Sequence, residues 1–136
     1  MSAAWDRTAV VAYLHDRGAM VDDQHTDTVV YYRGLTEEAL RAVDAAWPTT
    51  VEWQPWNNCP GLAAILMTVA PVIAAHGGSI VYHGYLVFGR PDARLTVEGF
   101  HYEGSQAAAH VLKDRFRTAD ERTLSADDTR LYTWWD

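Results

Sequence analysis

Residues 79–88 read SIVYHGYLVF, and residues 94–102 read RLTVEGFHY. These two stretches carry the strongest strand signal in the chain and so decide the class of the fold. Both are rich in the β-branched and aromatic residues that strands favour, and neither contains proline. The intervening GRPDA, residues 89–93, has the composition of a turn. The two stretches therefore predict a β-hairpin over residues 79–102, with Val87 opposite Leu95 and Tyr82 opposite Phe100.

Helical patterns surround this hairpin. Residues 3–17 place apolar side chains on one face at helical spacing, with Ser2 or Asp6 as the N-cap. Thr36 is a natural N-cap for a second helix, which Pro48 stops, and Ser105 is the natural N-cap of a last one. We expect each of these helices to bury one apolar face.

Residues 61–76 contain the longest apolar run of the chain. Because the run is apolar nearly all round, we expect a buried, central helix. Cys59 or Asn58 is expected to cap this helix, with Pro60 in its first turn. Pro71 should kink the helix or end its regular part, because proline lacks the backbone N–H.

Shorter β-branched and aromatic runs at 28–32 and 131–135 predict two more strands, and 49–53 is a further candidate. Helices and strands alternate without a strict βαβ rhythm. The sequence therefore predicts an α+β fold, in which a single layer of mostly antiparallel sheet, centred on the hairpin 79–102, packs against helices. The 136 residues suit one globular domain, residues 1–136.

The chain is acidic, with 18 Asp and Glu against 11 Lys and Arg and a formal net charge of −7. Proteins that bind nucleic acids usually carry a basic patch, and the sequence shows none, so we expect no direct nucleic-acid binding. An acidic surface suits a basic protein partner. The alternative is that the charge only keeps a small protein soluble.

Several features bear on location and cofactors. Cys59 is the only cysteine, which excludes an intramolecular disulfide and favours a reducing compartment. The N-terminus does not resemble a signal peptide, and the apolar stretch 62–75 is shorter than the about 20 residues of a membrane span. We therefore expect a cytoplasmic protein without membrane contact. No metal-ligand spacing or cofactor fingerprint is found, so we expect neither a metal nor a cofactor.

The hairpin supplies the candidate catalytic residues, which are His83, His101, Glu98 and Tyr85. In the expected register, His83 and His101 lie diagonally on one face, where they could share a metal with a carboxylate or one could act as a base. Glu98 would have a raised pKa if it were buried among aromatic rings. The alternative is two ordinary strand histidines and an exposed carboxylate. Cys59 is a weaker candidate nucleophile, because a helix start lowers a thiol pKa.

The middle of the chain is almost uncharged, since Glu52 is the only formally charged residue between positions 45 and 89. Within it, the segment 53–58 reads WQPWNN. Exposed tryptophans beside amide side chains are typical of contact hot spots. The candidate partner-binding residues are therefore Trp53, Gln54, Trp56 and Asn57. The alternative is that both indole rings fold back onto the sheet.

Together these features predict a small acidic protein–protein interaction module, of the inhibitor, immunity-protein or antitoxin kind, that binds a basic protein. The alternative is a small enzyme or ligand-binding domain, with a pocket lined by His and Tyr between the hairpin and the helix 61–76. The sequence shows no complete catalytic constellation, which favours the binding module. An exposed hairpin edge could support a homodimer. The alternative is that the C-terminal strand pairs with that edge and covers it.

Overall fold

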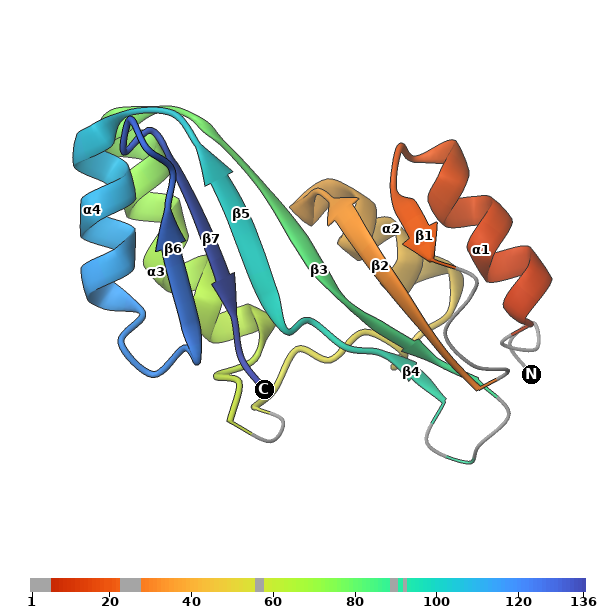
Figure 1. Cartoon of the computed structure of the whole chain (residues 1–136). Helices are drawn as coiled ribbons and strands as arrows, with labels where there is room; N and C mark the ends of the chain where they lie inside the picture. The colour runs from red at the N-terminus through yellow and green to blue at the C-terminus, as the bar shows by residue number, and fades with distance from the viewer. Residues whose placement is uncertain (1–5, 23–27, 56–57, 89–90, 92) are drawn as a thin grey trace. The chain divides into compact units, whose positions relative to one another are not determined.

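The computed structural model describes residues 6–22, 28–55, 58–88, 91 and 93–136. Within these ranges lie four helices and seven strands, and the strands belong to one sheet with antiparallel ladders (Figure 1). The predicted α+β fold is therefore confirmed. Contacts divide the chain into two compact units, the first made of Met1–Glu52 with Tyr82–Val97 and the second of Trp53–Val81 with Glu98–Asp136. One domain over 1–136 stays a prediction.

The first unit contains helices α1 (Arg7–Asp16) and α2 (Glu37–Ala46) and strands β1 (Met20–Asp22), β2 (Val29–Leu35), β4 (Arg94–Leu95) and most of β3 (Ser79–Val87). Strand β2 pairs with β1 on one side and with β3 on the other. Alternate side chains of β2 are fully buried, among them Tyr32, and so are Tyr82 and Leu86 of β3. They form the core of this unit together with Leu14 of α1 and Leu40 of α2, which are also fully buried.

The second unit contains helices α3 (Leu62–His76) and α4 (Gln106–Arg115) and strands β5 (Gly99–Glu103), β6 (Glu121–Leu124) and β7 (Arg130–Trp134), together with the start of β3. Strand β7 pairs with β5 and β6, and the two helices lie side by side on one face of these strands (Figure 1). Three rings fill the core: Phe116 packs edge to face against Phe100 at 5.0 Å and against Trp135 at 5.6 Å.

The predicted N-caps Thr36 and Ser105 are confirmed, and of the two alternatives for the first helix, Ser2 and Asp6, the cap is Asp6, so that this helix begins at Arg7. Asp6, Thr36 and Ser105 each accept a backbone N–H of the first helical turn on a side-chain oxygen, at 3.0 to 3.1 Å. Gly18 follows α1 with φ +82°, a conformation that residues with a side chain rarely adopt. The predicted first residues of α1, positions 3–5, lie outside the described residues.

The start of α3 differs from the prediction. Its N-cap is Gly61, which has φ +89° and no side chain to cap with, so the assignment to Cys59 or Asn58 is wrong. A Cβ on Gly61 would lie 2.5 Å from the carbonyl carbon of Gln54, so this site requires the small residue. The helix continues through Pro71 to His76.

The hairpin register is also corrected. Val87 pairs with Arg94, and Leu86 pairs with Leu95, one residue away from the expected alignment. Because apolar residues occupy both faces of both strands, the pattern fits either register about equally well. The returning strand is divided into β4 and β5, and of the candidate strand at 49–53 only an isolated bridge between Val51 and Leu95 forms.

Two strands escaped prediction, β1 and β6. Both stand at the ends of the strand order, with one neighbour each. Strand β1 is three residues long, and β6 reads ERTL, so neither has the length or apolar alternation by which strands are predicted.

Candidate functional site

Two of the four predicted partner-binding residues belong to the part of the chain that the structure describes. Trp53 is half-buried and Gln54 is exposed, whereas Trp56 and Asn57 lie outside the described residues. Whether the Trp53 indole is available to a partner or folds back onto the sheet stays a prediction. An indole that keeps part of its surface in water can still be buried by a partner.

The backbone at Trp53 and Gln54 is held against the start of α3. The carbonyl oxygen of Trp53 accepts the Ala63 N–H at 3.0 Å. The backbone of Gln54 approaches the α-carbon of Gly61 so closely that a side chain at position 61 would not fit. The tryptophan is therefore presented by a fixed backbone, which lowers the entropy cost of binding.

Exposed carboxylates lie beside Asn58, at the other end of the segment 53–58. The Asn58 side-chain amide donates to the backbone carbonyl of Asp136 at 3.2 Å. The Asp136 N–H in turn donates to a carboxylate oxygen of Asp120 at 2.6 Å. Both aspartates are exposed. We call Trp53, Gln54, Asn58, Asp120 and Asp136 the tryptophan-segment surface, and all five belong to the second unit.

Sequence reasoning missed three members of this surface, Asn58, Asp120 and Asp136. Asn58 and Asp136 are 78 positions apart in the chain, and Asp120 and Asp136 are 16 apart. No local pattern signals such contacts, because they depend on where the ends of α4 and β7 are packed.

Cys59 is buried, and its environment opposes the role of a nucleophile. Burial raises the pKa of its thiol to about 11, a hydrogen bond with the Gly61 backbone lowers it in part, and the nearby Glu98 carboxylate raises it further. The expectation that the start of α3 lowers this pKa is therefore wrong. A thiol with such a pKa is almost entirely protonated at neutral pH and unreactive.

The four candidate catalytic residues are divided between the units. His83 and Tyr85 belong to the first, and Glu98 and His101 to the second. The pairing of the two histidines therefore stays a prediction, and the hairpin alignment from which it followed is wrong by one residue at Val87.

Each candidate has its own surroundings. His83 is only 2% exposed and stands opposite Arg33 of β2. Tyr85 is half-buried, with its ring 5.9 Å from that of Tyr31 in an edge-to-face contact. The half-buried His101 stands opposite Tyr132 of β7, and the backbone oxygen of Glu98 accepts the Trp135 N–H at 2.7 Å.

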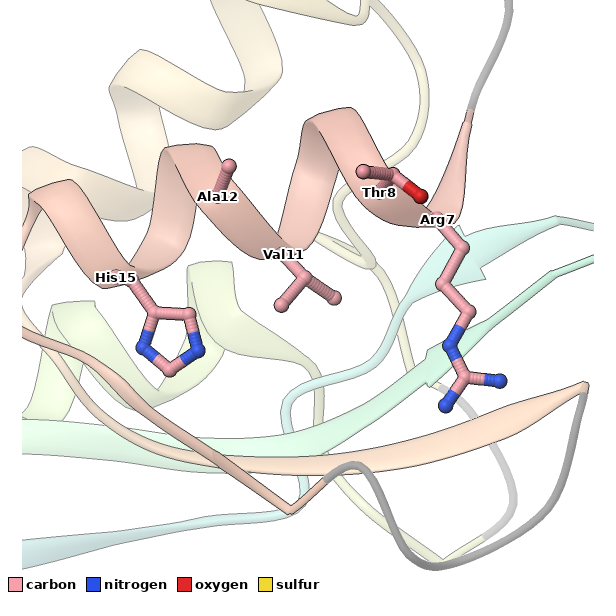
Figure 2. Close-up of a pocket in the computed structure, with 5 residues that line it drawn as sticks. All are labelled: Arg7, Thr8, Val11, Ala12 and His15. Atoms are coloured by element: carbon pink, nitrogen blue, oxygen red, sulfur yellow. The ribbon is translucent and has the colours of Figure 1, made fainter.

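Hollows of the first unit are lined by residues that sequence reasoning did not single out. One of about 430 Å³ lies along α1 and is lined by Arg7, Thr8, Val11, Ala12 and His15. Figure 2 shows Arg7, Val11 and His15 projecting from the same side of the helix. Another, of about 350 Å³, is lined on β1 and β2 by Met20, Val21, Asp22, Tyr31 and Arg33.

A hollow of about 200 Å³ in the second unit is lined by His101, Thr123, Leu124, Ser125, Arg130 and Tyr132. His101 thus stands beside hydroxyl groups and a guanidinium. Within the described ranges, no three His, Cys, Asp or Glu side chains gather where they could hold a metal ion. In the same part of the chain, each helix is too short or too polar to cross a membrane.

Comparison of the chain with protein-family models, with curated proteins and with solved structures gave no match.

Proposed function

We propose that this chain is a small acidic protein-binding module, of the inhibitor, immunity-protein or antitoxin kind, whose partner is a basic protein. The observation that carries the proposal is the tryptophan-segment surface. There a half-buried Trp53 stands on a fixed backbone, in the same unit as the exposed carboxylates of Asp120 and Asp136.

Trp53 is suited to be the anchor of the contact. Interface energy is concentrated in a few aromatic and arginine side chains, and an indole offers a large apolar area with few rotatable bonds. Because the backbone at Trp53 is already bonded to Ala63, little further ordering is needed on binding. The exposed amide of Gln54 can supply hydrogen bonds at the rim.

The charge supports a basic partner. Asp120 and Asp136 are exposed and are linked by hydrogen bonds to Asn58, the last residue of the segment 53–58, and the whole chain carries a net charge of −7. Carboxylates at the rim of an apolar contact attract Lys and Arg side chains, and the net charge accelerates the encounter with a cationic protein.

The alternative function, an enzyme or ligand-binding domain with a pocket between the hairpin and α3, lacks a comparable supporting observation. Its candidate residues are divided between the two units, and the thiol of Cys59 has a raised pKa. The binding module is therefore the function that we put to the test.

The experiment uses the immobilised full chain to capture proteins from a lysate of the source organism, followed by calorimetric titration of the identified, purified partner. Trp53→Ala should weaken binding by about 30-fold or more, the loss of an aromatic hot spot. Tyr31→Ala is the matched control, because Tyr31 is also half-buried but lies in the first unit. Binding should weaken as salt is raised. A partner whose affinity is unchanged by Trp53→Ala would exclude this surface.

A further inference from the structure

The sheet of the second unit has a polar face, on the side away from α3 and α4 (Figure 1). Strand β7 shows this in its alternation: Leu131 and Thr133 are fully buried, whereas Arg130 is exposed and Tyr132 is half-buried. Because successive side chains of a strand point to opposite faces, Arg130 and Tyr132 share the face that the helices leave uncovered. Both line the hollow of about 200 Å³ described above.

Three neighbouring strands each contribute a side chain to this hollow. Tyr132 of β7 pairs with His101 of β5 on one side and with Thr123 of β6 on the other, so the three residues form one row across the sheet. Neighbouring strands are about 4.8 Å apart, so the two ends of the row are separated by about 10 Å. A small ligand above the row is therefore within reach of side chains from all three strands.

The hollow offers mainly hydrogen-bond donors. Arg130 presents the five N–H groups of a guanidinium, Thr123 a hydroxyl, and His101 an imidazole N–H in either protonation state. In the part of the chain that the structure describes, none of these three side chains makes a hydrogen bond or an ion pair. Their donors are therefore available to a ligand with several acceptor oxygens.

We propose that this hollow binds a phosphate group, either as the free ion or as a small phosphate monoester. A guanidinium can hold two oxygens of a phosphate at once, through two parallel charge-assisted hydrogen bonds. Donors from the two flanking strands can then reach the other oxygens of a tetrahedral group, whereas a flat carboxylate has only two oxygens to offer. The chain carries a net charge of −7, yet no carboxylate is among the described residues that line this hollow.

Two carboxylates border the hollow without lining it. Glu103 pairs with Arg130 across β5 and β7, and no ion pair joins the two among the described residues. Asp127 accepts the Ser125 hydroxyl at 2.7 Å. Because both negative charges oppose an anionic ligand, we expect weak binding, with a Kd on the order of 1 mM. Replacing the charge next to the guanidinium, by Glu103→Gln, should tighten it.

The test is an NMR titration of the full chain with inorganic phosphate and with phenyl phosphate, at constant ionic strength. The backbone amides of residues 101, 123–125 and 130–132 should shift with a common Kd. A phenyl phosphate that binds more tightly than inorganic phosphate assigns the hollow to a monoester, and equal Kd values assign it to the free ion. Benzoate, which has the same ring with a carboxylate, should bind at least about fivefold more weakly than phenyl phosphate.

Side-chain variants connect the shifts to the hollow. Arg130→Gln should raise the Kd at least about tenfold, and Thr123→Val, which keeps the branched shape of a strand residue, about threefold or more. Arg33→Gln is the matched control, because Arg33 is also exposed on a strand and lines a hollow, but one that contains Asp22 and belongs to the first unit. It should leave the Kd unchanged. The amide spectrum of each variant confirms that it folds.

This site is independent of the proposed partner contact, so Trp53→Ala should not change the Kd for either phosphate. Three results would overturn the proposal: shifts scattered over the chain without saturation, a Kd that Arg130→Gln leaves unchanged, or benzoate that binds as tightly as phenyl phosphate. Loss of partner binding in Trp53→Ala with intact phosphate binding would separate the two sites.

Discussion

The phenol ring of Tyr102 lies where a side chain on Gly78 would have to be. A Cβ built on Gly78 would be 2.7 Å from two of the ring carbons. The Tyr102 hydroxyl donates to the Gly77 carbonyl at 2.9 Å and accepts the Ser105 N–H at 3.2 Å. Tyr102 therefore connects the residues that end α3 with the N-cap of α4, and the absence of a side chain at Gly78 makes this contact feasible.

Gly78→Ala should lower the free energy of unfolding by about 3 kcal/mol, because the methyl group collides with a buried ring and the backbone has φ +99°. Gly77→Ala is the matched control. It has φ +74°, but its Cβ would meet nothing within 4 Å, so it should cost only about 1 kcal/mol of backbone strain. Urea denaturation of both variants measures the difference. Equal losses would contradict a collision with Tyr102.

Two buried tyrosines of the first unit make a second comparison. The Tyr32 hydroxyl donates to the Thr96 carbonyl at 2.6 Å, whereas the buried Tyr82 hydroxyl has no hydrogen-bond partner among the described residues. Tyr32→Phe should therefore cost about 1 to 2 kcal/mol of unfolding free energy, and Tyr82→Phe should be neutral or stabilising. Thermal and urea unfolding of the two variants provide the measurement. A larger loss for Tyr82→Phe than for Tyr32→Phe would show that Tyr82 has a partner in the folded chain.

The turn between β6 and β7 should respond to acid through Asp127. Its carboxylate accepts both the hydroxyl and the N–H of Thr129, at 2.7 and 3.2 Å, and the Ser125 hydroxyl at 2.7 Å. These hydrogen bonds, those from Thr129 first, lower the pKa of Asp127 to about 2. Because the folded state favours the ionised form, the stabilisation is present above about pH 4, the ordinary range of an Asp pKa, and is lost as the pH falls towards 2.

The measurement for Asp127 is an NMR titration of its carboxyl group, combined with urea unfolding of the wild type and Asp127→Asn at several pH values. The stability difference between the two proteins should shrink as the pH is lowered through this window. A difference that stays constant down to pH 2 would contradict the lowered pKa.

Cys59 should be unreactive in the folded chain. With a pKa of about 11, its thiolate population at pH 8 should be lower than that of an ordinary cysteine by about two orders of magnitude. Labelling by a soluble disulfide reagent should therefore be at least about 100-fold slower than labelling of free cysteine, and unfolding in guanidinium should restore the ordinary rate. Rapid labelling of the folded chain would show that the thiol is ionised or accessible.

Sequence reasoning succeeded where the physical cause is local. The N-caps Thr36 and Ser105 were predicted, and Asp6 was one of two alternatives with Ser2, because each of these caps accepts an N–H only two or three residues ahead. It failed at α3, where the capping position is set by a contact with residues outside the helix: Gly61 must be a glycine because the backbone of Gln54 lies against it. The apolar composition of α3 also predicted a buried helix without showing that only one side of it is covered.

What the sequence determined by itself is the set of principal elements and the α+β class, since apolar periodicity, caps and turn residues act over a few positions. The tertiary structure decided the register in which Val87 meets Arg94, the pairing of the short edge strands, and the approach of Asn58 to Asp136. These depend on packing between segments far apart in the chain. A strand that is apolar on both faces can pair in several registers, and an amide side chain at a turn can bond to many acceptors. Only the packing of distant segments selects one of them.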